Sequence, residues 1–495
     1  MSEDEIEPEV LAHYLICSGC IGEAYLKAEV ERNGDKGDCT YCSETKKVIT
    51  ICDLADRVDA ALVDHYERTQ DEPTALQYAL HRDKDIFYQW ERRGEPVAEV
   101  ICETAHIDER IAEHVRQVLE ERHYDFDAAV AGEENPYDIE AHYDEKGVED
   151  YELQEGWAYF QQTLKTETRV FNREAEAILD SIFEDLGEHI TLQSDPVIMG
   201  VGPTCHIAQL YRARVFQSGD KLESALMRPD QEIGPPPFSA ANAGRMNASG
   251  ISVFYGATEP DVALAEVRPP VGSRVAVAQF EIIRPLQLLD VEALRSIYVE
   301  GSIFDTSYIS RLQKAKFLRR LSDQLTMPVM PERESDDYLV TQGIADYLAS
   351  REEPKIDGII YRSIQKGDEG RNVVLFHKSS RVENLNLPEG TSTSAQLWEI
   401  SENEPVPDYS VFDKIPDPIK EDTPYAVKTE RLIGYENSHG GLVYFVSSPQ
   451  QEDSRESALR IDTETVEVHH IDRIQVEATR YFVKRYKVSK GADEL

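Results

Sequence analysis

A single carboxylate, Glu266, stands in a stretch whose other residues are almost all apolar. The stretch from Val262 to Val267 is a short helical run that Thr258 can cap and that Pro260 can begin. A carboxylate in apolar surroundings is costly unless something pairs with it, and we expect this partner to be an arginine or a polar ligand, so Glu266 is a candidate for chemistry or ligand binding. The alternative is an ordinary glutamate that faces solvent from a short helix.

An arginine and a serine lie on either side of this glutamate in the sequence, each next to an apolar segment. Arg212 follows Tyr211 at the head of one such segment. Downstream, the run from Asp357 to Ser363 predicts a strand with the hydroxyl group of Ser363 at its end. The chain therefore offers Arg, Glu and Ser in that order, each at the edge of an expected strand or helix.

This order resembles that of the RES domain, a family named for these three residue types and best known as the toxin half of bacterial RES/Xre pairs. The likeness covers roughly residues 207–378 and consists of several short motifs in the correct order. Met246 departs from the family pattern, which usually has an aromatic residue there. The residues that carry the likeness are Arg212, Gly244, Arg245, Asn247, Tyr255, Glu266 and Ser363.

The resemblance implies that NAD is the substrate and that the bond between nicotinamide and ribose is attacked. RES domains are similar in fold to ADP-ribosyltransferases, and members have been described as NAD glycohydrolases, NAD phosphorylases and protein ADP-ribosyltransferases. Loss of nicotinamide leaves an oxocarbenium-like ribose, which the Glu266 carboxylate would stabilise. A regulatory module that holds NAD or ADP-ribose without cleaving it is the alternative from another class.

The resemblance also implies roles for the flanking residues. Arg212 and Arg245 would bind the pyrophosphate through their planar guanidinium groups. Tyr255 would stack on the nicotinamide ring, and Tyr211 would pack on a ribose or the adenine, although either tyrosine could equally be an ordinary core aromatic. Ser363 has no histidine neighbour in the sequence, so we expect it to donate a hydrogen bond to the phosphate or the attacking group.

Four of the seven cysteines are arranged as two CxxC pairs with eighteen residues between them. This spacing is typical of a four-thiolate zinc site, in which each pair supplies one edge of the tetrahedron. The closed shell of sulfur ligands leaves no open position, so the zinc would be structural. A redox pair or free thiols is the alternative. The predicted ligands are Cys17, Cys20, Cys39 and Cys42.

Length and hydrophobic periodicity predict a multi-domain α+β protein. A chain of 495 residues, 41% of them hydrophobic, can bury roughly two to four cores. Apolar residues recur at helical spacing, as in Ile107, Ile111 and Val115, and we expect one long helix from Tyr151 to His189 and a loop or linker from Ala128 to Asp150. The expected domains are a zinc-knuckle region (1–60), a helical bundle (61–195), the RES-like domain (207–378) and a β-rich extension (379–495).

This order of domains resembles bacterial proteins with a HEPN/RES amino-terminal domain. Active HEPN domains cut RNA with an Arg and a His that have four to six residues between them, and Arg116 and His123 have six. Gln117 stands where the family usually has Asn. The favoured alternative is a salt-bridged arginine and a surface histidine. The bundle would then pack against the RES-like domain, dimerise or sense a ligand.

Two segments after Glu266 in the sequence have predicted secondary structure. A mostly helical insertion between Leu294 and Ala349 separates Glu266 from Ser363 and could cover the pocket. Beyond it, a proline-rich region predicts an extended loop, and alternation near the end predicts strands of a small sheet. Adjacent histidines His469 and His470 would point to opposite faces of a strand, so a shared metal site is not expected. The prolines are Pro405, Pro407, Pro416, Pro418 and Pro424.

The net charge of −42 argues against a broad nucleic-acid surface, because phosphate binding depends on Lys and Arg. An acidic protein can still bind NAD in a locally basic pocket. The sequence has no apolar run long enough to cross a bilayer, and its first residues are acidic, which predicts a cytoplasmic protein without a membrane partner. An antitoxin or regulatory protein and a second copy of the chain are the protein partners left open.

Overall fold

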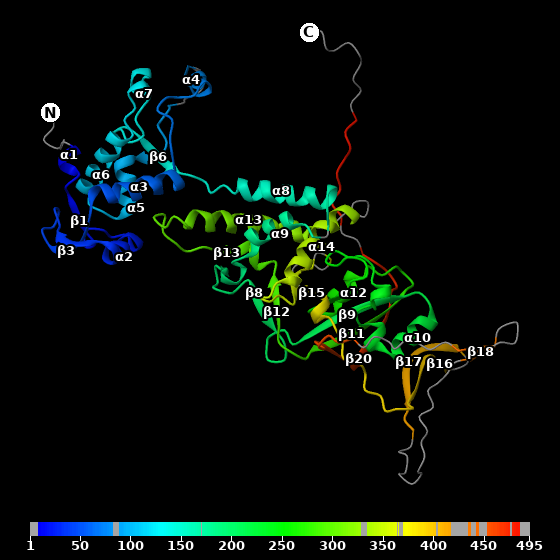
Figure 1. Ribbon diagram of the computed structural model, residues 1–495. Helices are drawn as coiled ribbons and strands as arrows, with labels where there is room; N and C mark the ends of the chain where they lie inside the picture. Colours follow the sequence, from blue (N-terminus) through cyan, green and yellow to red (C-terminus); the bar gives the residue numbers. More distant parts are fainter. Residues whose placement is uncertain are drawn as a thin grey trace. The chain divides into compact units, whose positions relative to one another are not determined.

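The computed structural model forms two compact units (Figure 1). The first unit is Met1–Val197 with Ala293–Leu325, and the second is Ile198–Glu292 with Thr326–Leu495. The structure describes residues 8–82, 89–169, 171–327, 334–363, 365, 370–401, 404–416, 434–436, 442–444, 453–475 and 478–485. Pro418 and Pro424, part of the predicted proline-rich loop, lie outside these residues. No helix within these ranges is long and apolar enough to cross a membrane.

The first unit begins with a small antiparallel sheet in the order β1-β3-β2. Thr50, the last residue of β3, forms a capping box with Asp53 of the next helix. Thr50 Oγ1 accepts from the Asp53 amide, and the Asp53 carboxylate accepts from the Thr50 amide. The long helix α3 starts there. The elements are α1 (Pro8–Leu11), β1 (Leu15–Cys17), α2 (Ala24–Asn33), β2 (Asp35–Asp38), β3 (Thr45–Thr50) and α3 (Ile51–His65).

Helices α3, α5 and α6 form the core next to this sheet. The predicted helical face is confirmed for Ile111 and Val115, which are buried on α6, whereas Ile107 is buried but lies before this helix begins. The loop predicted from Ala128 to Asp150 is wrong in part, since β6 lies inside it and pairs with both β4 and β5. These elements are β4 (Tyr66–Arg68), α4 (Ala75–Arg82), β5 (Glu95–Pro96), α5 (Val97–Ala105), α6 (Glu109–Arg122), α7 (Phe126–Ala131) and β6 (His142–Glu145).

The rest of the first unit is helical. The single helix predicted from Tyr151 to His189 is wrong: α8 (Tyr151–Thr166) and α9 (Arg173–Phe183) are separate, because Asn172 caps α9 by accepting from the Ala175 amide at 3.0 Å. Helix α13 (Tyr308–Thr326), from the predicted insertion, packs on α8, where Trp157 Nε1 donates to Gln324 Oε1 at 3.0 Å. Strands β7 (Ile190–Thr191) and β13 (Ile297–Tyr298) pair.

The second unit is built on an eight-stranded mixed sheet in the order β20-β11-β9-β10-β15-β14-β12-β8. All its pairings are antiparallel except β12 with β14. The strands are β8 (Ile198–Val201), β9 (Gln209–Phe216), β10 (Phe254–Ala257), β11 (Arg274–Ile282), β12 (Leu286–Asp290), β14 (Gly358–Arg362), β15 (Arg371–Leu375) and β20 (Leu459–His470). The predicted α+β class is therefore confirmed, with one large mixed sheet.

Alternation along the strands gives this sheet two apolar faces. One face packs with α10 (Gly219–Met227) and with Ile233, directly after α11 (Pro229–Glu232). The other packs against α12 (Pro260–Glu266) through Val262 and Ala263. Successive residues of a strand point to opposite faces, so the register decides which side chains reach α12. Helix α14 (Glu334–Ser350) completes the helices of this unit that the structure describes.

The carboxyl-terminal part differs from its prediction in two respects. Strand β20 joins the large sheet beside β11, whereas a separate small sheet was expected. Pro405 and Pro407, expected in a loop, belong to β17 (Glu404–Lys414), which pairs with β16 (Ser392–Ser401). A two-stranded ribbon has a free edge on each strand and so tolerates residues that lack an N–H group. Strands β18 (Gly434–Glu436) and β19 (Leu442–Tyr444) form another pair.

Candidate functional site

Glu266 is the last residue of α12, and the structure gives it hydrogen-bond partners. Pro260 begins this helix, and Val262 and Ala263 bury one of its sides in the sheet. The Glu266 side chain itself is exposed. Its Oε1 atom accepts from Ser363 Oγ at 3.0 Å and from Asn372 Nδ2 at 2.7 Å (both within the second unit). The partners of Glu266 are therefore two neutral side-chain donors, where an arginine or a polar ligand was expected.

Ser363 and Asn372 are held in place by the pairing of β14 with β15. Ser363 follows β14 directly, and Asn372 lies on β15 opposite Tyr361. Both are buried, with exposed fractions of 1% and 4%. Asn372 was missed by the sequence analysis. The available signal was a polar residue at the head of the apolar run Val373–Leu375.

Tyr361 is a second residue missed, although it lies in the same predicted strand as Ser363. Because residues 361 and 363 are two apart, their side chains emerge on the same face of the sheet. Burial raises the pKa of the Tyr361 hydroxyl, and the nearby Glu266 carboxylate adds to this effect. Tyr361 therefore forms part of the polar surroundings of Glu266.

Arg212 occupies a different position from Glu266 and Ser363. Its β9 neighbour across the sheet is Ala278, on the face that α10 covers, and its guanidinium lies over the Phe254 ring at 5.3 Å. Burial and then the charge of Arg214 lower the pKa of Arg212 to about 10. Among the residues described, Arg212 Nη1 is buried without a hydrogen-bond partner, and Arg212 makes no hydrogen bond or ion pair with Glu266.

A guanidinium nitrogen that is buried and unpaired is costly, so this position favours an anion. Contact with Phe254 offsets part of the cost through a cation–π interaction. Arg212 could therefore bind a phosphate group on its own side of the sheet. The structure brings Glu266 and Ser363 together, and Arg212 stands apart from them in its contacts.

The Gly-Arg-x-Asn motif is a turn that Tyr255 holds. The Tyr255 hydroxyl donates to Asn247 Oδ1 at 2.9 Å and accepts from the Met246 amide at 2.9 Å. A Cβ atom on Gly244 would lie 2.7 Å from that hydroxyl oxygen, which explains the glycine. Burial raises the pKa of Tyr255 to about 12. Arg245 donates from Nη2 to the Met327 carbonyl, and its Nε is buried with no partner in the described parts.

Tyr211 points to the other face from Arg212, as expected for neighbours on one strand. Its hydroxyl donates to Gln279 Oε1 at 3.2 Å and accepts from Gln209 Nε2 at 3.2 Å. Its ring packs in the same apolar cluster as Val262. These contacts fit a core aromatic as well as a ligand contact, so the role of Tyr211 stays a prediction.

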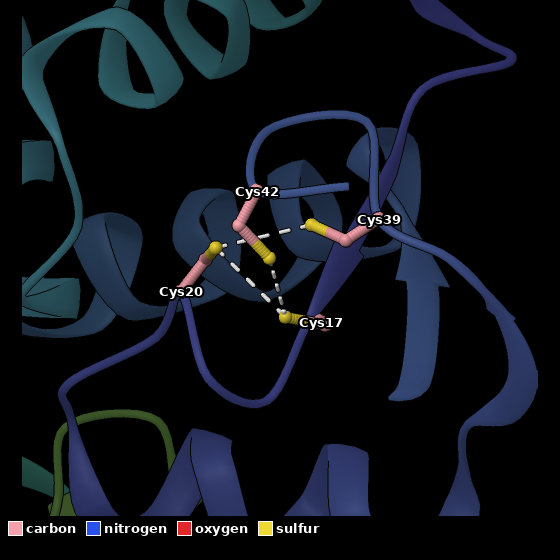
Figure 2. Close-up of side chains that lie close together, drawn as sticks. All are labelled: Cys17, Cys20, Cys39 and Cys42. Carbon is pink, nitrogen blue, oxygen red and sulfur yellow. Dashed lines mark hydrogen bonds between the residues drawn. The ribbon is translucent and has the colours of Figure 1, made fainter. Parts of the chain in front are cut away.

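The four predicted cysteine ligands converge in the first unit (Figure 2). Their sulfur atoms all lie within 4.8 Å of one another. The separations are 3.8 Å for Cys17–Cys20, 3.6 Å for Cys17–Cys42 and 3.8 Å for Cys20–Cys39. Zinc–sulfur bonds of about 2.3 Å in a tetrahedron place sulfur atoms roughly 3.8 Å apart. The cluster could therefore hold a metal ion, and its geometry fits zinc.

Backbone amides support this cluster of thiols. Burial alone would raise the pKa of Cys39, but amide donors from Cys42 and Tyr41 outweigh it and lower the pKa to about 7. Each CxxC pair is also closed by a turn, in which the Cys20 amide donates to the Cys17 carbonyl and the Ser43 amide donates to the Cys39 carbonyl. Amides aimed at sulfur thus favour the thiolate form at Cys39, whereas burial and then hydrogen bonds from neighbouring thiols raise the pKa of Cys17 and Cys20.

The second cysteine loop is joined to helix α6. Tyr41, between Cys39 and Cys42, forms a hydrogen bond of 3.0 Å between its hydroxyl and Nδ1 of the buried His114. Arg110, also on α6, places its guanidinium 5.4 Å from the centre of the Tyr41 ring. The cysteine cluster is therefore joined through Tyr41 to helix α6 of the first unit.

The contacts of Arg116 and His123 are those of structural residues. Arg116 is 5% exposed and bonds to Glu113, to Glu120 and to the Tyr137 carbonyl. His123 pairs with Asp59 at 3.0 Å. These contacts support the favoured alternative, and the likeness to HEPN domains stays a prediction. His469 pairs with Glu467, whereas its neighbour His470 pairs with Tyr409.

The comparison with known families matches part of the second unit. Residues 209–395 match the model of the RES domain family. The chain carries a RES domain. The matched range contains every residue predicted for catalysis and NAD binding, and Asn372 as well, while the cysteine cluster lies outside it. No curated protein matches the chain. The RES domain supports an NAD-related, toxin-type function in general terms.

Proposed function

We propose that the RES domain cleaves the bond between nicotinamide and ribose in NAD, as a phosphorylase or a glycohydrolase. The chain would act in the cytoplasm as a bacterial toxin or defence effector. One observation carries the proposal: Glu266 is an exposed residue, yet two buried donors, Ser363 and Asn372, hold one of its carboxylate oxygens. A fixed carboxylate open to a ligand suits the stabilisation of charge that develops only in the transition state.

Glu266 would stabilise the ribosyl cation as nicotinamide leaves. Ser363 donates to this carboxylate and has no histidine partner among the described residues, which supports a hydrogen-bonding role over a nucleophilic one. Arg245 would bind the pyrophosphate of the NAD held at Glu266, whereas Arg212, on the other face of the sheet with its unpaired Nη1, would bind an anion there. Tyr255 and Tyr211 would contact the nicotinamide and the ribose or adenine through their rings.

The same positions fit other acceptors. Transfer to a protein side chain would make the chain an ADP-ribosyltransferase, which agrees with the proposed likeness in fold to that class. A module that only holds NAD or ADP-ribose would need the same arginines. An antitoxin, another regulatory protein or a second copy of the chain would be its protein partners. In the first unit, zinc at the four cysteines would be structural.

Nicotinamide release by the full-length chain tests the proposal. Purified protein is incubated with NAD, with and without inorganic phosphate, beside Glu266→Gln. We expect release that this substitution lowers by about 10²–10³-fold, because one charge-stabilising group is lost. A phosphate requirement would identify a phosphorylase. Glu281→Gln is the matched control, because Glu281 is exposed on the same sheet and its ion pair with Arg460 spans 3.8 Å. Binding of NAD without release would overturn the proposal in favour of the non-catalytic module.

A further inference from the structure

The two oxygens of Glu266 are not equivalent. Oε1 accepts hydrogen bonds from Ser363 Oγ and Asn372 Nδ2, at 3.0 and 2.7 Å. Oε2 accepts none from the part of the chain that the structure describes, and the side chain is exposed. A carboxylate bound through one oxygen presents the other to a ligand. Oε2 is therefore the open atom of this site.

We propose that Asn372 is a positioning residue that, together with Ser363, fixes Glu266 so that Oε2 faces the ribose of NAD. This assignment rests on the proposed function. Asn372 lies on β15, which pairs with β10 on one side and β14 on the other, so its backbone has little freedom. A single donor would leave the carboxylate free to rotate, whereas donors from Ser363 and Asn372 fix its plane.

The other end of the Asn372 amide supports this assignment. Asn372 Oδ1 is buried and has no hydrogen-bond partner among the described residues. An unsatisfied buried acceptor is unfavourable, and a functional role is one of the explanations for such a group in a native structure. Turning the amide over would place Oδ1 against Glu266 Oε1, where two acceptors would repel each other. The amide therefore leaves Oδ1 unpaired and keeps its donor on the carboxylate.

The kinetics of nicotinamide release by the full-length chain test this role. Asn372→Leu keeps a similar side-chain volume without the donor, and Ser363→Ala removes the hydroxyl. We expect each to lower kcat by roughly 10–100-fold and to change KM by less than about threefold, because misorientation affects the transition state more than NAD binding. Melting temperatures confirm that the variants fold.

Combining Asn372→Leu with a substitution of Glu266 distinguishes a positioning role of Asn372 from a structural one. Glu266→Asp keeps the charge but withdraws the carboxylate from both donors. Adding Asn372→Leu to Glu266→Asp should then cost less than threefold, because the positioned group is already displaced. The same loss in both backgrounds would show that Asn372 acts only on structure and would overturn the assignment.

The outcomes also distinguish the assignment from the proposed function. If Glu266→Gln abolishes release while Asn372→Leu keeps the wild-type kcat, the assignment fails and the function stands. If wild-type protein releases no nicotinamide, the proposed function fails, and the assignment fails as well. If Glu266→Gln releases nicotinamide at the wild-type rate, NAD cleavage stands, but the role of Glu266 and the assignment of Asn372 both fail.

Discussion

Replacing Tyr255 with phenylalanine separates two roles of this residue. The change keeps the ring that would stack on nicotinamide but removes the hydroxyl that bonds to Met246 and Asn247, each at 2.9 Å. Met246 and Asn247 are only 4% and 3% exposed, so water cannot easily replace the lost bonds. An unsatisfied buried group costs about 1–3 kcal/mol. With two such groups and some relaxation, we expect the turn to lose about 2–4 kcal/mol.

Hydrogen–deuterium exchange measures this loss locally. The Met246 amide should exchange at least about 30-fold faster in Tyr255→Phe, since about 2 kcal/mol corresponds to roughly this factor. Tyr211→Phe is the matched control, because its hydroxyl makes longer bonds of 3.2 Å to glutamine side chains. If exchange at Met246 changes by less than twofold, the hydroxyl does not hold the turn and the reasoning is wrong.

Two further predictions concern the first unit. We expect close to one zinc per chain, measured by mass spectrometry of metals. Because structural zinc contributes folding energy, Cys39→Ser should lose the metal, and the first unit of this variant should melt at a lower temperature. Cys205→Ser, in the second unit, is the control and should change neither the zinc content nor this melting temperature. Burial alone would raise the pKa of Asp185, but His189 and Lys314 lower it from 3.8 to about 2. The resulting stability of about 2 kcal/mol is present above pH 4 and lost as the pH falls towards 2, so urea unfolding should show the advantage of wild type over Asp185→Asn shrinking in that range. A constant difference would contradict this.

Local patterns predicted the parts of the molecule that depend on neighbouring residues. The spacing of Cys17, Cys20, Cys39 and Cys42 was enough to predict a site that could hold a metal, because each CxxC pair folds as its own turn. Helical periodicity likewise identified the buried side of α6. The break between α8 and α9 had a local signal that was missed, namely the capping residue Asn172.

Features that depend on strand pairing were not predictable from the sequence in the same way. Asn372 reaches Glu266 because β15 pairs with both β10 and β14, and no local pattern states that pairing. The register of β9 with β11 likewise places Arg212 opposite Ala278, and no local sequence pattern gives this register. Strand β20 was placed in a separate sheet because its partner, β11, is far away in the sequence. The order of Arg, Glu and Ser identified the family without showing which of them meet.

The register of the central strands therefore determines the geometry of the carboxylate site. Glu266 comes from a helix, whereas both of its donors come from the adjoining ends of β14 and β15. A slip of one residue between these strands would turn Asn372 to the opposite face and remove its donor. Val373 and Ile360 lie opposite each other in the register, and both are buried in the apolar cluster on the face covered by α10. A slip would expose them, so their burial disfavours it. Apolar packing on the face covered by α10 thus fixes the hydrogen bonds on the face covered by α12, so the core and the candidate active site cannot vary independently.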